Sequence, residues 1–232
     1  MTNPFANALY DYHFDEMTGP LIYRRGDKTE EVGIEFYFDV VDGEGSWIDP
    51  YLDGPLLDMG AGAGRHSLYF QDQFETIAIE QNELLVEVLR DRGVEDARLV
   101  DMFDLSGTFE EGRFESAIAF GTQVSLCRSM QGLSQFFEDL AYVTTSNGAA
   151  VIDGYDPEKE MTKSKLDYYD DPSDGLAYRL LQMEYAGTLG EPWLYRLFTP
   201  DRVREATDNT AWEVVEERYA TESLYQLALE KH

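Results

Sequence analysis

The chain has 232 residues, 43% of them hydrophobic and 13% aromatic, a composition that excludes a disordered protein. Its 46 acidic and 18 basic residues give a net charge of -28, which argues against nucleic-acid binding through neutralised phosphates. No apolar run approaches the roughly 20 residues of a membrane helix, and a single cysteine, Cys127, excludes an internal disulfide.

The acidic residues are spread from Asp11 to Glu230, which favours a solvated acidic surface over one acidic face that meets a basic partner. Carboxylates in such excess repel one another unless salt screens them. We therefore expect a halophilic protein of a high-salt cytoplasm. The first residues lack the basic start and apolar run of a secretory signal, which also predicts a cytoplasmic location.

The first half of the chain begins with an aromatic-rich segment and then alternates between strands and helices. Residues 1–52 show no strand alternation and predict a mostly helical N-terminal cap. A loop signal formed by Asp53, Gly54 and Pro55 precedes an apolar strand that begins at Leu56. Further segments follow in order: a helix at 66–73, a strand at 76–80, a helix that ends at Gly93, strands at 97–101 and 114–120, and a helix around 133–140.

A turn at Asn147 and Gly148 leads into a fifth buried strand at 149–153. Strands that alternate with helices pair in parallel through right-handed crossovers, and such sheets bind ligands at the carboxyl ends of their strands. After Pro157 the pattern changes. It predicts antiparallel strands at 177–187 and 192–198 joined by residues 188–191, a helix capped by Thr199, and terminal strands from Trp212 and Leu224.

We therefore expect one α/β domain over residues 1–232. Its core is a doubly wound, mostly parallel seven-stranded sheet, with an antiparallel hairpin inserted after the fifth strand. The parts are the N-terminal cap at 1–52, a cofactor-binding half at 53–157, and a substrate-side hairpin with terminal strands at 158–232.

Gly60, Gly62 and Gly64 occupy alternate positions between a buried strand and a helix. A dinucleotide fingerprint requires its third glycine where this chain has Arg65. A phosphate loop is excluded because no Gly-Lys-Ser/Thr follows. Two interpretations stay open, a loop that lets a ligand approach the backbone and a turn that only packs strand on helix.

The loop, with Asp58 ending the strand before it, resembles motif I of the class I S-adenosylmethionine-dependent methyltransferases. The resemblance extends from about Leu56 to the end of the chain. It implies that Asp58 holds the cofactor amino group, that Glu80 binds the ribose, and that Gln81 and Asp101 lie near the adenine. The cofactor-binding residues that it implies are Asp58, Gly60, Ala61, Gly62, Gly64, Arg65, Glu80, Gln81, Asp101, Met102, Phe103, Phe120 and Gly121.

The residues themselves support part of this assignment. Glu80 ends an apolar strand about twenty residues after the glycines, and a carboxylate there can accept two hydrogen bonds from vicinal hydroxyls. For Asp101, a solvated loop acid is the alternative. Ala61 stands where many members of the family have Cys or Ser.

Metal binding is not expected, because His13, His66 and His232 form no two-histidine pattern at ligand spacing. His13 belongs to an aromatic segment, where a buried cluster is the main interpretation and catalysis the alternative. Tyr10 and Tyr155 are the other candidate catalytic residues.

Residues 120–123 differ from the Asn/Asp-Pro-Pro-Tyr/Phe sequence of amino-methylating DNA enzymes, which counts against that substrate class. We expect an S-adenosylmethionine-dependent methyltransferase of a small molecule, of the type found in halophilic archaea. The alternatives are a protein or RNA methyltransferase and a non-catalytic protein that binds the cofactor.

Overall fold

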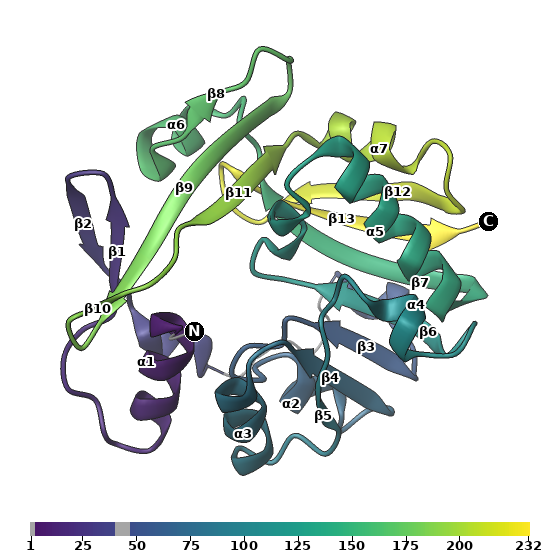
Figure 1. Ribbon diagram of the computed structural model, residues 1–232. Coiled ribbons are helices and arrows are strands. Elements are labelled where there is room, and N and C mark those ends of the chain that lie inside the picture. Colours follow the sequence, from purple (N-terminus) through teal and green to yellow (C-terminus); the bar gives the residue numbers. More distant parts are fainter. Residues whose placement is uncertain (1–2, 40–46) are drawn as a thin grey trace.

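The computed structural model describes residues 3–39 and 47–232. The strands of its larger sheet are β3 (Leu56–Met59), β4 (Thr76–Glu80), β5 (Ala97–Leu99), β6 (Phe114–Ala119), β7 (Thr144–Tyr155), β12 (Trp212–Tyr219) and β13 (Leu224–Lys231). Their spatial order is β12-β13-β7-β6-β3-β4-β5 (Figure 1). The strands from β3 to β7 pair in parallel, whereas β13 runs antiparallel to both β7 and β12. The expected α/β fold with seven strands of mixed direction is confirmed.

Helices cover both faces of this sheet, which explains why its central strands are mainly apolar and buried, with buried polar exceptions such as Asp58, Glu80 and Ser116. α2 (Ser67–Phe70) and α3 (Glu83–Asp91) pack on the face that contains Leu56 and Ala78. α4 (Leu105–Thr108), α5 (Met130–Val143) and α7 (Pro200–Thr207) pack on the face of Leu57 and Ile79. Successive residues of a strand point to opposite faces, so each strand contributes to both cores.

A second sheet joins the N-terminal segment to the segment that follows β7. Its strands are β1 (Ile22–Arg25), β2 (Lys28–Glu31), β8 (Tyr169–Asp170), β9 (Leu176–Tyr185), β10 (Thr188–Leu189) and β11 (Trp193–Phe198). β9 is the central strand and pairs antiparallel with β1, β8, β10 and β11. In Figure 1 this sheet lies across from the carboxyl end of β7.

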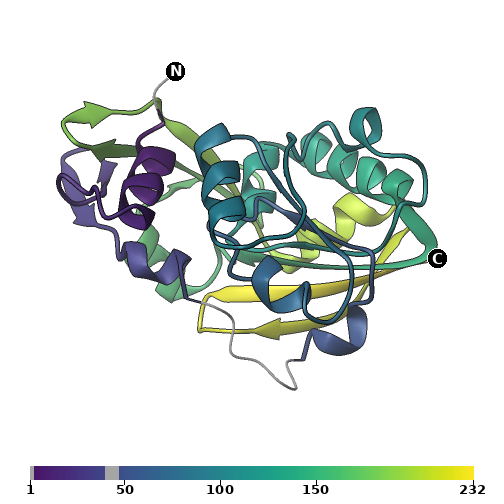
Figure 2. The ribbon, with the colours of Figure 1, turned by 90° about the horizontal axis from the view of Figure 1, so that it is seen from below.

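The N-terminal segment is less helical than its sequence predicted. It contains α1 (Pro4–His13), the 3₁₀ helices η1 (Ile34–Tyr37) and η2 (Asp49–Tyr51), and the β1–β2 hairpin. The hairpin escaped prediction because β2 is exposed along its whole length and shows no apolar alternation. Residues 1–2 and 40–46 of the predicted cap lie outside the described residues. α1 packs beside α3, as the view from below shows (Figure 2).

Three predicted boundaries are wrong for local reasons. Asn147 and Gly148 lie inside β7, where the pairing with β6 changes register, and do not form a turn. After β9 the chain turns at Ala186 and Gly187, which both have positive φ, and β10 folds back onto the end of β9. The helix expected at 66–73 is the shorter α2. No helix in the part of the chain that the structure describes has the length and apolar character to cross a membrane.

Candidate functional site

The glycine loop follows β3 at the carboxyl edge of the seven-stranded sheet. The Gly60 amide donates a hydrogen bond of 3.0 Å to the carbonyl oxygen of Ile79, which fastens the loop to β4. Gly62 and Gly64 both have positive φ, a backbone conformation that glycine adopts without steric cost.

The surroundings of these two glycines differ. A Cβ atom placed on Gly62 would have no other atom within 4 Å, whereas one on Gly64 would lie 2.8 Å from Leu89 and 2.9 Å from Val94. Gly64 thus allows the loop to pack on the α3 side, while Gly62 leaves its backbone open to a ligand. The two interpretations of the glycine pattern apply to different glycines of one loop.

Glu80 ends β4 next to this loop, as its position in the sequence predicted. Its carboxylate accepts a hydrogen bond of 2.7 Å from the Gly62 amide and one of 3.2 Å from the Gln81 amide. The residue is only 9% exposed, and burial raises the pKa of Glu80 to about 7. The two amides lower that pKa in part, and the nearby Asp58 raises it.

Asp58 is buried behind the loop, with 2% of its surface exposed. Its carboxylate accepts a hydrogen bond from the Ser67 hydroxyl and thereby holds the start of α2. Burial raises the pKa of Asp58 to about 6, while the hydrogen bonds from Ser67 lower it. The contact of Asp58 with a cofactor amino group stays a prediction.

Asp153 performs a similar role on β7, and the sequence reasoning did not select it. Its carboxylate accepts hydrogen bonds from the amides of Gly121 at 3.2 Å and Thr122 at 2.6 Å, which fixes the loop after β6. Burial raises the pKa of Asp153 to about 6. The signal was present, because Asp153 ends a buried apolar run just as Glu80 does.

The other predicted cofactor residues lie in loops that follow neighbouring strands. The Asp101 carboxylate accepts a hydrogen bond of 3.0 Å from the Phe103 amide, Met102 is buried, and Phe103 is 42% exposed. Phe120 packs against the ring of His66, with the ring centroids 4.8 Å apart. Ala61 packs with the residues of α3. Cofactor contacts from these residues remain predictions.

Arg65 joins the glycine loop to the N-terminal segment. Its guanidinium lies 4.4 Å from the ring centroid of Phe36 and donates a hydrogen bond of 3.3 Å to the Phe36 carbonyl oxygen. Arg92 reaches the carbonyl oxygens of Ala63 and Phe38. These contacts hold η1 beside the loop.

Two of the candidate catalytic residues lie against α3. The His13 ring is 2.7 Å from the Asp91 carboxylate, and the Tyr10 hydroxyl donates a hydrogen bond of 3.2 Å to Glu87. Both partners belong to α3, and among the described residues neither candidate forms a hydrogen bond or ion pair with the glycine loop. Tyr155, by contrast, ends β7 two residues after Asp153.

Two further reactive side chains, those of His66 and Cys127, are uncharged at neutral pH. Burial lowers the pKa of His66 to about 3, so its ring is neutral, and burial raises the pKa of the Cys127 thiol to about 12. Within residues 3–39 and 47–232, no group of three or more His, Cys, Asp or Glu residues is arranged to hold a metal ion.

Solved methyltransferases have structures similar to this one. An S-adenosylmethionine-dependent methyltransferase from Bacteroides fragilis, in complex with S-adenosyl-L-homocysteine, matches 98% of this chain and 94% of its own, with a TM-score of 0.79 and 20% identity. One from Methanosarcina mazei matches 83% of this chain and 98% of its own, with a TM-score of 0.63 and 14% identity.

The 1,6-didemethyltoxoflavin-N1-methyltransferase of Burkholderia thailandensis covers 76% of this chain and 70% of its own, with a TM-score of 0.51 and 18% identity. No family model and no curated protein matches the sequence. At these identities the likeness shows the fold, and the fold is the α/β fold of S-adenosylmethionine-dependent methyltransferases.

Proposed function

We propose that the protein is an S-adenosylmethionine-dependent methyltransferase that acts on a small molecule. The junction of the glycine loop with Glu80 carries this proposal, because it combines an open backbone at Gly62 with a buried carboxylate 2.7 Å from the amide of that residue. The similarity of nearly the whole chain to a methyltransferase solved with S-adenosyl-L-homocysteine supports it.

The residues at this edge fit the cofactor. Glu80 would accept hydrogen bonds from the two ribose hydroxyls, and the open backbone at Gly62 would lie along the methionine part. Asp101 would face the adenine amino group, with Met102 and Phe103 as apolar neighbours of the ring. The positive φ of Gly62 and the absence of side-chain atoms around it leave space for such a ligand.

When bound, S-adenosylmethionine supplies a methyl group that the positive sulfonium already activates. The protein must therefore orient the acceptor and exclude water from the reacting atoms. A general base is needed only for an acceptor that arrives protonated. Burial and Asp153 raise the pKa of Tyr155 above its ordinary value, so this hydroxyl keeps its proton at neutral pH and would act as a hydrogen-bond donor.

Calorimetry with S-adenosylhomocysteine and NADH tests the proposal. We expect the wild type to bind S-adenosylhomocysteine and to ignore NADH, and we expect Glu80→Ala to weaken binding by about 1.5 to 3 kcal/mol, the range for hydrogen bonds to a charged group. Binding of NADH alone would refute the proposal.

Turnover separates the alternatives. Release of S-adenosylhomocysteine from S-adenosylmethionine should occur with fractions of a cell extract that contain only small molecules. Release only with the macromolecular fraction would favour a protein or RNA methyltransferase. Tight binding without release in any fraction would favour a non-catalytic protein.

We also propose that the protein works in the cytoplasm of a high-salt organism. The net charge of -28 and the spread of its acidic residues support this setting. Screening should relieve the repulsion between carboxylates, so the melting temperature should rise from low to molar KCl. A melting temperature that stays constant across this range would contradict the proposal.

A further inference from the structure

Arg179 of β9 is a half-buried cation that has no anionic partner within residues 3–39 and 47–232 of this strongly acidic protein. Its Nε atom is buried and has no hydrogen-bond partner, and no carboxylate among the described residues forms an ion pair with it. Arg25, Arg65 and Arg196 also have a buried, unpartnered Nε. Glu30 and Asp171 pair with Arg25 and Arg196, and Arg65 lies over the Phe36 ring and donates to the Phe36 carbonyl oxygen. A desolvated and unpaired charge is unfavourable, so Arg179 lacks a partner that a ligand could supply.

The register of the second sheet decides where Arg179 points. Along β9 it occupies the same face as Ala177 and Leu181, which are buried, because alternate residues of a strand share a face. Tyr195 of β11 lies directly opposite Arg179, and the guanidinium is 5.8 Å from the centroid of its ring. Arg179 therefore interrupts an inward-facing apolar row.

Three more tyrosines lie around this arginine. The hydroxyls of Tyr23 and Tyr37 are 2.9 Å apart. Burial raises the pKa values of Tyr23, Tyr155 and Tyr195, and the positive charge of Arg179 partly opposes this rise in each of them. These neutral hydroxyls come from β1, η1, β7 and β11, and all are half-buried. They surround the guanidinium with groups that can donate hydrogen bonds but cannot neutralise it.

One carboxylate that the charge of Arg179 influences, Asp167, is already engaged. Arg179 is among the charges that lower the pKa of Asp167, but it contributes less than Lys28 and Arg25. The Asp167 carboxylate lies 2.6 Å from the Lys28 ammonium, which holds it. Asp167 therefore does not replace the missing partner of Arg179.

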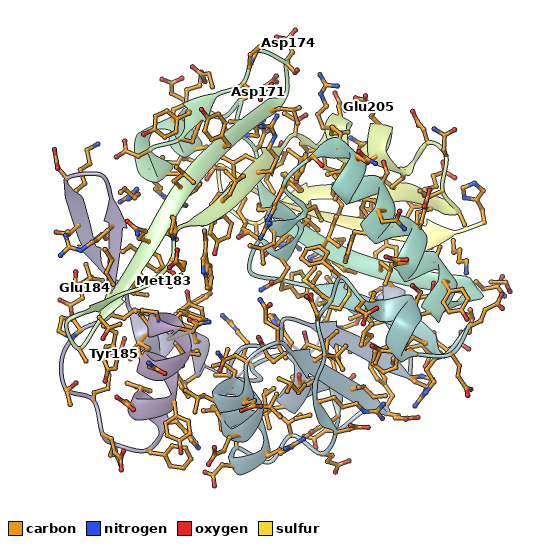
Figure 3. The ribbon with its side chains drawn as sticks, in the orientation of Figure 1. Asp171, Asp174, Met183, Glu184, Tyr185 and Glu205 are labelled. Carbon is orange, nitrogen blue, oxygen red and sulfur yellow. The ribbon has the colours of Figure 1, made fainter. Side chains whose placement is uncertain are left out.

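This cluster, formed by Arg179, Tyr23, Tyr37, Tyr155 and Tyr195, lies next to the carboxyl edge of the larger sheet. Tyr155 ends β7, and Tyr37 belongs to η1, which Arg65 holds beside the glycine loop. η3 (Gln123–Cys127) packs against both β7 and β11. Figure 3 shows Met183 and Tyr185 at the end of β9 near α1 and Asp171 and Asp174 beyond its other end.

We propose that Arg179 binds a carboxylate group of the methyl acceptor, and that the enzyme thereby selects small anionic acceptors over neutral and cationic analogues. The two terminal nitrogens of a guanidinium, Nη1 and Nη2, form a fork that matches the two oxygens of a carboxylate. The hydroxyls of Tyr23 and Tyr155 can donate to the same group, whereas a protonated amine would be repelled. The inference rests on the proposed methyltransferase function and specifies its acceptor.

The test compares carboxylic acids with their primary amides, beginning with benzoate and benzamide and continuing with phenylacetate and phenylacetamide. Each compound is titrated by NMR into the full chain saturated with S-adenosylhomocysteine, at one KCl concentration. We expect the wild type to bind each acid at least about tenfold more tightly than its amide, the factor that corresponds to about 1.4 kcal/mol. Arg179→Gln should remove this preference.

Arg218→Gln is the matched control, because it removes the same charge from an exposed position on β12, where Arg218 lies over the Trp47 ring. This variant should keep the preference for acids. Circular dichroism checks the fold of each variant. If Arg179→Gln fails to fold, Arg179→Lys decides, since it keeps the charge but lacks the fork and should lower the preference without reversing it.

Several outcomes would overturn the inference: a wild type that binds none of the acids, equal affinity for acids and amides, or an undiminished preference in the folded Arg179 variant. The proposed function fails on different evidence, because it requires S-adenosylhomocysteine to bind the wild type before any acid is added. If the protein binds S-adenosylhomocysteine but shows no preference for acids, the proposed function stands and the proposed acceptor class is wrong.

Discussion

The two sides of the candidate site satisfy their polar groups differently. On the cofactor side, Glu80 and Asp153 each accept hydrogen bonds from two backbone amides of the adjoining loops. On the proposed acceptor side, Arg179 has no carboxylate partner among the residues that the structure describes, and the hydroxyls of Tyr23 and Tyr37 contact each other. The proposed cofactor side is therefore organised by its own hydrogen bonds, whereas the proposed acceptor side keeps polar groups that a ligand could engage.

Substitution of two glycines in one loop should separate packing from ligand contact. Gly64→Val should lower the free energy of unfolding by about 3 kcal/mol, because a β-branched residue at positive φ would also collide with Leu89 and Val94. Gly62→Val introduces only backbone strain and should lower the free energy of unfolding by about 1 to 2 kcal/mol.

For ligand binding we expect the opposite order, with the larger loss in Gly62→Val than in Gly64→Val. Gly62→Val should abolish S-adenosylhomocysteine binding in calorimetry, because its side chain would occupy the space beside the open backbone. Urea denaturation measures the stability of both variants. Wild-type affinity in Gly62→Val would show that the ligand does not approach this backbone.

Asp153 provides a test of how far the cofactor side is organised in advance. Asp153→Ala should lower the free energy of unfolding by about 2 kcal/mol, because the amides of Gly121 and Thr122 lose their acceptor. Asp201→Ala is the control, since its side chain is 93% exposed and its removal should change stability by less than about 1 kcal/mol. Equal effects in urea denaturation would mean that Asp153 does not hold the loop.

The raised pKa of Glu80 gives the cofactor side a dependence on pH. In the folded, ligand-free protein this pKa is about 7, above the ordinary 4.5, so the folded state retains a proton that the unfolded state has lost between these values. The contribution of Glu80 to stability therefore falls as pH rises through this window. Glu80→Gln should lose this component when its urea titrations are compared with those of the wild type.

Ligand affinity should change in the opposite direction, because ribose hydroxyls donate to the ionised carboxylate. Between about pH 6 and about pH 8 the affinity of the wild type for S-adenosylhomocysteine should rise about tenfold, as a group with a pKa of about 7 loses its proton. Calorimetry across this range should show a much flatter profile for Glu80→Gln. A parallel rise in both proteins would assign the dependence to another group.

The smallest effect is expected at His13, which lies away from both sides. His13→Ala removes a partly exposed contact with Asp91 and should change the free energy of unfolding by less than about 1 kcal/mol. Its affinity for S-adenosylhomocysteine should match that of the wild type. A large loss of turnover in a folded His13→Ala protein would restore this histidine as a catalytic candidate.

Local pattern was enough to predict the larger sheet and the position of its glycine loop. Apolar runs that end in Asp58 and Glu80 predicted buried strands, and the structure has β3 and β4 there. The glycine pattern was also a local signal, because Gly60, Gly62 and Gly64 all have positive φ, which glycine adopts without steric cost. Such features depend on neighbours in the sequence, where short-range periodicity is informative.

Long-range pairing decided how the proposed acceptor side is assembled. The sequence predicted strands at 177–187 and 192–198, but no local pattern predicted that β1 pairs with β9. β1 forms a sheet with β9, which lies more than a hundred residues later in the chain, and this pairing places Tyr23 opposite Met183. Arg179 meets Tyr195 only through the register of β9 with β11. A shift of one residue would turn Arg179 to the opposite face, and such a register is set by the packing of the whole sheet.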